Sequence, residues 1–137
     1  MAKKKLTSKQ ATKKLDQLIR DILKAQAGEN PQCFICGKHT GWFHPKENPK
    51  GLQVNHYISR RVLPLRWDLL NVFPGCSGCN YTHQYNQLAF TKKILDEFGQ
   101  ERIDYFDAKV KAYKKKGKTM PVTKRRELLA QLQEYYD

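Results

Sequence analysis

Two cysteine pairs, Cys33-Phe34-Ile35-Cys36 and Cys76-Ser77-Gly78-Cys79, decide the fold of this 137-residue chain, and they contain all four of its cysteines. In a Cys-x-x-Cys turn both thiolates face one side, and two such turns supply the four sulfur ligands that zinc binds tetrahedrally. The alternatives are disulfides, which a reducing compartment disfavours, and a redox motif, which needs only one such turn. The spacing therefore predicts a structural zinc site made by Cys33, Cys36, Cys76 and Cys79.

The chain is short, strongly basic and rich in aromatic residues. Lys and Arg number 26 against 13 Asp and Glu, which gives a formal net charge of +13, and Phe, Trp and Tyr make up 11% of the residues. A charge this large in a single domain favours a polyanionic partner over a neutral metabolite. Because 39% of the residues are hydrophobic, the chain can bury a core, which excludes disorder throughout.

The sequence shows neither a membrane span nor a signal peptide. No apolar run approaches the roughly 20 residues that cross a bilayer. The basic residues 1–5 are followed by no apolar stretch and no small-residue cleavage site. We therefore expect a cytoplasmic protein with reduced cysteines and no membrane partner.

Basic residues concentrate near the C-terminus. Residues 109–126 contain nine basic and no acidic residues, and the stretch from Lys3 to Lys14 is also basic. Such a run is either a solvated helix end or a surface that contacts phosphates. Since the whole chain is basic we favour phosphate contact, and the candidate residues in this strip are Lys114, Lys115, Lys116, Lys124, Arg125 and Arg126.

Hydrophobic periodicity predicts helices on both sides of the cysteine-rich middle. From Ser8 to Ala27 apolar residues recur at helical spacing, and Gly28 ends the pattern. After Cys79 three further helical stripes follow, and we expect them to form core. They are Tyr81, Tyr85, Leu88, Leu95 and Phe98, closed by Gly99; Ile103, Phe106, Val110 and Tyr113; and, after a Thr123 cap, Leu128, Leu129, Leu132 and Tyr136.

The middle of the chain is irregular and has one strand-like run. Residues 52–58 alternate, with Leu52, Val54, His56 and Ile58 on one side. We therefore divide the chain into a basic N-terminal helix or arm at 1–30, a zinc-bound core at 31–107, and a Lys-rich strip with a C-terminal helix at 108–137.

Polar residues that a zinc site does not require lie between and just after the cysteine pairs: Asn55, His56, Asn71, Asn80, His83 and Asn86. A His at a strand end, an Asn before the second pair and an Asn directly after it resemble the HNH, or ββα-metal, nuclease motif on a treble-clef zinc scaffold. Over residues 31–107 the succession is similar to the phage NinG/Rap recombination endonucleases. The shorter portion with His56 and Cys-x-x-Cys-Asn is similar to the phage endonuclease VII group.

This resemblance implies an α+β fold, a zinc-stabilised treble-clef ββα-metal (HNH) core flanked by N- and C-terminal helices. It also implies a metal-dependent endonuclease for branched DNA such as Holliday junctions and D-loops, in the host cytoplasm if a phage encodes it. Because a four-way junction is nearly two-fold symmetric, we expect a homodimer. The apolar residues of the helices at 8–27 and 123–136 would suffice for its interface.

The chemistry of phosphodiester hydrolysis assigns roles to these residues. His56 is the candidate general base, since neutral imidazole can take a proton from water. The amide oxygens of Asn55 and Asn80 suit a catalytic Mg²⁺ or Mn²⁺, and His83, one helical turn from Asn80, is either a further ligand or a surface residue. By the family's pattern Asn71 holds the loop that orients His56, and Asn86 is left without an assigned role.

Arginines just beyond His56 are candidate contacts to the phosphates that flank the cut. They are Arg60, Arg61 and Arg66, and the alternative for Arg66 is a local ion pair with Asp68.

Two features weaken the nuclease interpretation: Asn55 is neutral where the wider motif has Asp, and neighbours on a flat strand face opposite ways. The alternatives are a non-catalytic zinc-stabilised DNA-binding module, an HNH nuclease for linear or nicked duplex DNA, and an RNA-binding or phage accessory protein.

Overall fold

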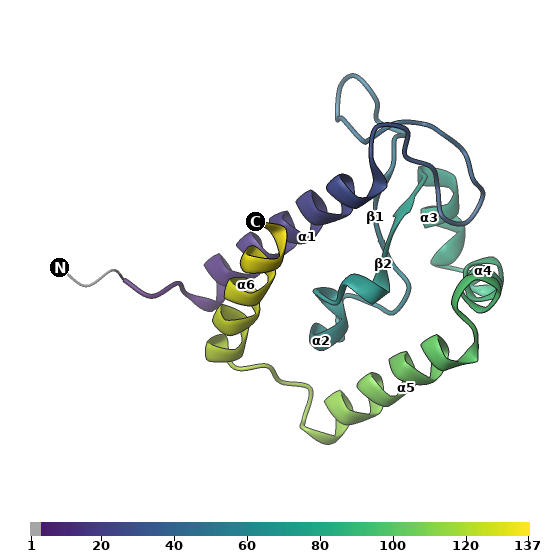
Figure 1. Ribbon diagram of the computed structural model, residues 1–137. Helices are drawn as coiled ribbons and strands as arrows, with labels where there is room; N and C mark the ends of the chain where they lie inside the picture. The colour runs from purple at the N-terminus through teal and green to yellow at the C-terminus, as the bar shows by residue number, and fades with distance from the viewer. Residues whose placement is uncertain (1–3) are drawn as a thin grey trace.

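A small antiparallel sheet, β1 (Gln53–His56) and β2 (Val72–Gly75), lies among helices in the computed structural model, which describes residues 4–137 (Figure 1). The helices are α1 (Ser8–Ala27), α2 (Leu63–Arg66), the 3-10 turn η1 (Leu69–Asn71), α3 (Ser77–His83), α4 (Leu88–Phe98), α5 (Gln100–Lys115) and α6 (Val122–Tyr136). The predicted α+β class is therefore confirmed. Lys3, counted above in the basic N-terminal stretch, lies outside the described residues.

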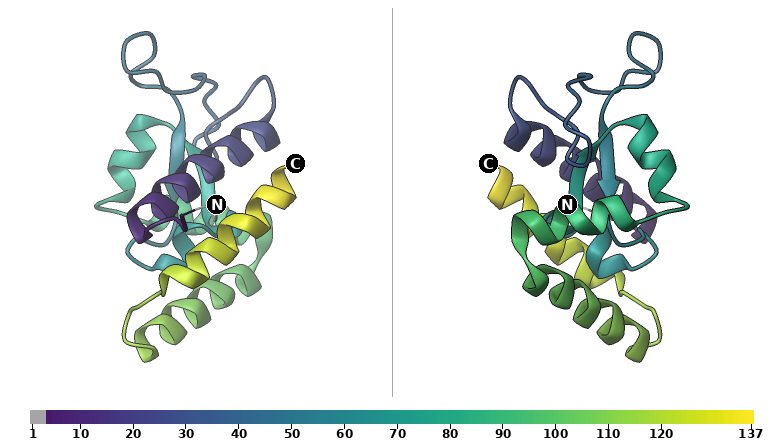
Figure 2. Two further views of the ribbon diagram at one scale, coloured as in Figure 1. Left: turned by 90° about the vertical axis from the view of Figure 1, so that its left-hand side faces the viewer. Right: turned by 90° about the vertical axis from the view of Figure 1, so that its right-hand side faces the viewer.

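The first helix has the bounds that its periodicity predicts. Thr7 and Gln10 form a capping box, in which each side chain bonds the other residue's backbone N–H, and Gly28 ends the helix at a positive φ of 78°. Its apolar stripe packs against α6, which lies beside it in the left view of Figure 2. The buried members of this cluster are Leu15, Leu18, Ile19, Ile22, Leu23, Trp67, Val72 and Leu132.

The helices expected to form a dimer interface pack on each other within the chain. The apolar stripe of α1 and residues Leu128, Leu129 and Leu132 of α6 contact one another. The homodimer itself stays a prediction, and much of the apolar surface assigned to its interface is used inside one chain. The physical reason is that two amphipathic helices bury their stripes most cheaply against each other when the chain brings them together.

The strand at the candidate site is shorter than the alternation at residues 52–58 suggests. β1 pairs with β2 only from Gln53 to His56, where His56 lies opposite Val72. Beyond His56 the chain turns away, and Tyr57 and Ile58 pack into a second cluster rather than continuing the strand. A strand end therefore carries His56.

The second cluster is aromatic and lies between the sheet and helices α4 and α5. Its buried members are Tyr57, Leu65, Phe73, Phe90, Ile94 and Phe106. The stripe of Tyr81, Tyr85, Leu88, Leu95 and Phe98, expected in the core, is exposed instead, with Leu88 at 75%. The prediction fails because these residues do not belong to one helix. Residues 84–87 separate α3 from α4, and in α4 it is Phe90 and Ile94 that are buried.

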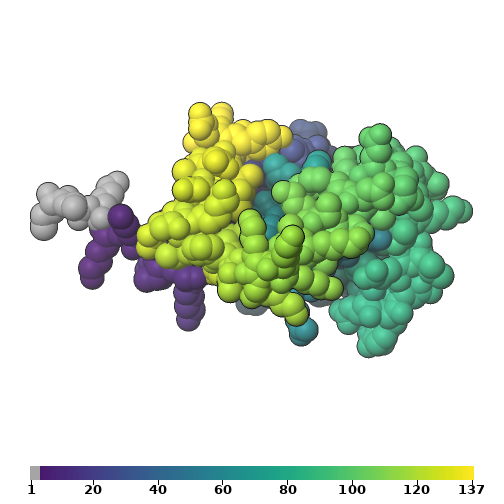
Figure 3. All heavy atoms as spheres, turned by 90° about the horizontal axis from the view of Figure 1, so that it is seen from below, coloured from purple at the N-terminus to yellow at the C-terminus, as the bar shows by residue number. Residues whose placement is uncertain are grey.

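The C-terminal part of the chain follows the predicted helices closely. Phe106 and Tyr113 of α5 are buried as expected, while the last helix begins at Val122 with Pro121, rather than Thr123, at its cap. Figure 3 shows the face on which α5, the loop after it and α6 lie. Within the described residues, no helix is both long enough and apolar enough to cross a membrane.

Two arginines of the basic strip have structural roles. Arg125 donates hydrogen bonds to Ser8 and Thr12 of α1, and both Nε and Nη2 of Arg126 donate to the Leu6 carbonyl. These two arginines therefore join α6 to the start of α1, and their contact with phosphates stays a prediction. The lysines at 114–116 stay exposed, and Lys124 makes only a long, exposed pair with Glu127.

Candidate functional site

The four cysteines form one cluster beside the sheet. The first pair lies in a turn that the Phe34 N–H ties to the Pro74 carbonyl of β2, at 2.8 Å. The second pair follows β2 directly, with Cys76 at the N-cap of α3 and Cys79 in its first turn. All four sulfur atoms lie within 4.8 Å of one another, and those of Cys36 and Cys76 are 3.7 Å apart. Tetrahedral zinc with Zn–S near 2.3 Å requires sulfurs about 3.8 Å apart, so the cluster fits that ion.

The four thiols differ in how readily they ionise. Burial opposes the Cys33 thiolate, but backbone hydrogen bonds from Cys36, Cys76 and Ile35 lower its pKa to about 7. Burial raises the pKa of Cys79, and the neighbouring Cys76 and Cys36 raise it further. A divalent ion at the centre removes this conflict, because it binds all four groups as thiolates.

His56 lies at the end of β1 with its two ring nitrogens in different surroundings. Nε2 is 2.8 Å from the Arg66 carbonyl oxygen, and because a carbonyl only accepts, Nε2 carries the proton. That leaves the lone pair on Nδ1, which has no hydrogen-bond partner among residues 4–137. Burial lowers the pKa of His56, and the charges of Arg60 and Arg66 lower it further, which outweighs the Arg66 carbonyl and Asp16. His56 is therefore a neutral, oriented base near pH 7.

The two residues after His56 are fixed by side chains from elsewhere in the chain. Asn71 is fully buried; its Oδ1 accepts the Ile58 N–H at 2.8 Å, and its Nδ2 donates to the carbonyls of Ile58 and Leu65. His83 Nε2 donates to the Tyr57 carbonyl at 3.1 Å. The loop-holding role expected for Asn71 agrees with these hydrogen bonds.

His83 is half-buried, and its two ring nitrogens have different surroundings. Its ring lies edge-on against Phe90, with centroids 4.7 Å apart. Because Nε2 is occupied by the Tyr57 carbonyl, Nδ1 is the nitrogen left for a metal, and that atom is buried without a partner among the described residues. Asn86, in turn, accepts the Leu88 N–H and so caps the start of α4.

Asn55 is buried on the opposite side of β1 from His56, at 3% exposure. Its Nδ2 has no partner in the described part of the chain and lies so near Gly75 that a Cβ there would stand 2.6 Å from it. Only glycine leaves this room. Asn55 also lines the groove to which Asn80 contributes. Neighbours on a strand face opposite ways, yet Asn55 and His56 both line this groove.

A groove of about 860 Å³ brings the predicted residues together at this strand end. Its lining includes Asn55, His56, Asn80, His83, Arg60, Arg61, Arg66, Gln84 and Gln87. Among the described residues it contains four histidine or amide groups singled out from the sequence and no carboxylate. Asn71 does not line the groove, and its side chain instead bonds the backbone of Ile58, two residues after His56.

The arginines around the groove differ in their freedom. Arg60 and Arg61 are exposed and, within residues 4–137, make no salt bridge. Arg66 makes a two-point pair with Asp16 of α1, with Nη2 to Oδ2 at 2.6 Å and Nε to Oδ1 at 3.0 Å. The alternative that Arg66 pairs with Asp68 is wrong, because its partner is Asp16, fifty residues earlier; its contact with a phosphate stays a prediction.

Sequence reasoning missed the part that α1 has at this site. Asp16 accepts hydrogen bonds from both Arg66 and the Trp67 indole, and Arg66 supplies the carbonyl that orients His56. Nothing local marks Asp16 for this role, because the contact joins distant segments. Gln84 was within reach of prediction, since it stands four residues after Asn80 and helical spacing puts the two on one face.

Comparisons with protein-family models, with curated proteins and with solved structures found no match to this chain. The class that the coordinates define is an α+β protein with a four-cysteine cluster suited to structural zinc. Any activity has to be inferred from the side chains themselves.

Proposed function

We propose that this protein is a metal-dependent endonuclease of the HNH type, with a treble-clef ββα core, that cuts branched DNA in recombination. The observation that carries the proposal is His56: a neutral imidazole with Nε2 bound to a carbonyl and Nδ1 free, at the mouth of a basic groove. The order of cysteine turn, β1, β2, second cysteine pair and α3 supports it, because that order is the one the resemblance implies.

In this proposal His56 takes a proton from the attacking water at Nδ1 while the Arg66 carbonyl holds the ring. Arg60 and Arg61 neutralise phosphates on either side of the cut. Asn71 and His83 are positioning residues, since they fix the backbone of Ile58 and Tyr57 directly after the base.

A divalent cation fits the groove through neutral oxygen ligands. Asn55 and Asn80 both line the groove, and their amide oxygens would hold the ion together with water and phosphate oxygens. When bound, Mg²⁺ or Mn²⁺ polarises the phosphate and stabilises the departing 3′ oxygen. The expected products carry a 5′-phosphate and a 3′-hydroxyl.

Binding that does not depend on DNA sequence is supported by the kind of contacts available. The exposed cations, such as Lys114, Lys115 and Lys116, suit phosphates and carry no information about sequence. Resolution of a junction by paired nicks also calls for a homodimer, whose interface would lie outside the covered faces of α1 and α6.

One observation favours a second candidate, a zinc-stabilised DNA-binding module without catalysis. The groove lining has no carboxylate in the described part of the chain, so a cation there would be held by neutral groups alone. Neutral ligands bind Mg²⁺ weakly. This candidate predicts DNA binding that His56→Ala leaves intact and no cutting under either ion.

The test compares cleavage of a labelled four-way junction with a linear duplex of the same sequence, in Mg²⁺ and in Mn²⁺. Wild type, His56→Ala and the control His39→Ala are used, because His39 is exposed and makes no side-chain hydrogen bond within residues 4–137. We expect cutting of the junction, lost by at least about 10²-fold in His56→Ala and unchanged in His39→Ala.

The other outcomes decide between the alternatives. Equal cutting of both DNAs would reduce the protein to a general HNH nuclease for linear or nicked duplex. Tight binding with no cutting in Mg²⁺ or Mn²⁺ would favour the non-catalytic module.

A further inference from the structure

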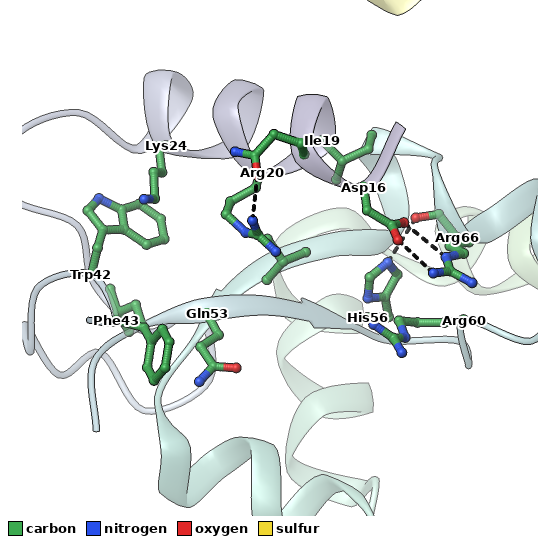
Figure 4. Close-up of a pocket in the computed structure, with 13 residues that line it drawn as sticks. Asp16, Ile19, Arg20, Lys24, Trp42, Phe43, Gln53, His56, Arg60 and Arg66 are labelled. Atoms are coloured by element: carbon green, nitrogen blue, oxygen red, sulfur yellow. Dashed lines mark hydrogen bonds and ion pairs between the residues drawn. The ribbon is translucent and has the colours of Figure 1, made fainter. Parts of the chain in front are cut away.

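A second groove, of about 460 Å³, runs between α1 and β1 and ends at His56 (Figure 4). Figure 4 shows Trp42 and Phe43 at one end and His56 and Arg60 at the other, with Arg20 and Lys24 on the α1 side. Phe43 is bonded to Leu52, which is four residues before His56, so the groove extends about 13 Å. Its volume lies within the range of about 300–1,000 Å³ typical of ligand sites. It can therefore hold a nucleotide or two and excludes a duplex.

The groove is positively charged. Arg20, Lys24 and Arg60 are exposed and form no salt bridge among the residues described. The carboxylate of the lining, Asp16, is already neutralised by Arg66. A ligand here is accordingly an anion with charge spread along its length.

An aromatic platform lies at the far end from His56. Phe43 is 41% exposed, although its backbone is fixed: its N–H donates to the Leu52 carbonyl at 2.9 Å. Asn48 holds the same loop by donating to the carbonyls of Thr40 and Trp42. Lys24 Nζ stands 5.7 Å from the Trp42 ring centroid. A rigid, exposed ring beside cations suits a base stacked next to its phosphate.

We propose that an unpaired strand of the substrate leaves the cleavage site through this α1–β1 groove, its phosphates on Arg20 and Lys24 and a base stacked on Phe43. This rests on the proposed function and sharpens it: the preferred substrate has single-stranded DNA beside the cut, as at a fork, flap or opened branch. The groove meets the cleavage site at His56 and Arg60, which line both hollows, so one strand can pass between them.

The test measures binding rather than cutting, with no Mg²⁺ or Mn²⁺ added. Fluorescence anisotropy of one labelled sequence is followed as a fork with unpaired arms and as a blunt duplex, at several salt concentrations. Wild type, Phe43→Ala, Phe43→Trp and the double variant Arg20→Ala/Lys24→Ala are compared with Tyr136→Ala, an exposed aromatic at the end of α6 and outside the groove lining.

We expect Phe43→Ala to bind the fork about tenfold more weakly and the duplex as wild type does, because one base loses its stacking partner. Phe43→Trp restores fork binding, and Tyr136→Ala changes neither. The double variant lowers the salt slope of log K for the fork by about 1.4, at about 0.7 for each phosphate contact to a single strand, and leaves the slope for the duplex unchanged.

The proposal is overturned if Phe43→Ala binds the fork as tightly as wild type, or loses fork and duplex binding equally. Failure of the nuclease function would look different. If the protein prefers forks through Phe43 but cuts no DNA, the groove proposal stands and the nuclease proposal fails. If the protein cuts DNA and Phe43→Ala binds the fork as wild type does, the nuclease proposal stands and the groove proposal fails.

Discussion

The two ends of the chain and the segment between its cysteine pairs are held together by different forces. α1 and α6 bury one another's aliphatic stripes, with Leu15 and Leu132 both in that cluster. At the candidate site, three consecutive residues are instead fixed by polar contacts: His56 by the Arg66 carbonyl, Tyr57 by His83 and Ile58 by Asn71.

This difference follows from what each region has to do. Apolar packing tolerates small rearrangements, because many contacts share the energy. A hydrogen bond fixes one atom against another, and a base misplaced by about 1 Å can lose about 10²-fold in rate. The packing of α1 against α6 supplies stability and the polar contacts after His56 supply position, so changes to these two sets of contacts should separate in stability and rate measurements.

Loss of the metal should have the largest effect, confined to the middle of the chain. We expect Cys76→Ser to lose zinc, and with it the amide protection of residues 53–83 in hydrogen exchange, since structural zinc contributes about 10–16 kcal/mol in small domains. Ser77→Ala, at the exposed neighbour, should keep both. Stoichiometric zinc retained by Cys76→Ser, or protection unchanged without zinc, would contradict the four-cysteine site.

A cavity in the flank should lower stability and leave the chemistry alone. Leu15 is fully buried between α1 and its neighbours, so Leu15→Ala should lower the free energy of unfolding by about 3 kcal/mol. Leu88→Ala, at a leucine that is 75% exposed, should stay within about 0.5 kcal/mol of wild type. Denaturant unfolding measures both, and equal losses would show that this helix face is not core.

Asn71→Ala should cost somewhat less stability but much more activity. It leaves the Ile58 N–H and the Leu65 carbonyl without their partner, a loss of about 2 kcal/mol. Thr7→Ala, as a control, removes a side-chain hydrogen bond to the Gln10 backbone N–H at the start of α1, away from His56 and both grooves. At a temperature where both variants are folded, single-turnover cleavage should fall about 10²-fold in Asn71→Ala only. Equal rates would leave Asn71 a purely structural residue.

The pH dependence of stability should show the smallest effect. Burial lowers the pKa of His56 in the folded protein, so below the unfolded value near 6.5 the unfolded chain binds the proton first. Stability is then complete above about pH 6.5 and falls as the pH drops toward the folded pKa. Thermal unfolding between pH 5 and 8 measures this slope, which His56→Gln should reduce; an unchanged slope would assign it to other groups.

The sequence predicts the parts of this molecule that depend on local pattern. The bounds of α1 and the burial of Phe106 and Tyr113 follow from helical periodicity, and the four-cysteine cluster follows from spacing. The prediction that the stripe beginning at Tyr81 is buried was wrong, because periodicity does not reveal the break between two helices at residues 84–87.

Contacts between distant segments lie beyond such patterns. The run of basic residues near the C-terminus does not reveal that Arg125 and Arg126 bind the start of α1. The residues around Arg66 in the sequence likewise do not reveal that its partner is Asp16. Each depends on which helices meet in three dimensions. The groove of Arg20, Lys24 and Phe43 belongs to the same class, since three separate segments build it.

The central claim is that His56 acts as an oriented, neutral base, and a pH–rate profile tests it most directly. Single-turnover cleavage of a four-way junction is measured from pH 5 to 8 with wild type, His56→Ala and His39→Ala, and junction binding is measured in parallel. We predict an acid limb with a midpoint below about 6.5 in wild type and His39→Ala, and loss of cleavage with binding intact in His56→Ala. Cleavage by His56→Ala at the wild-type rate, with the same acid limb, would contradict the account.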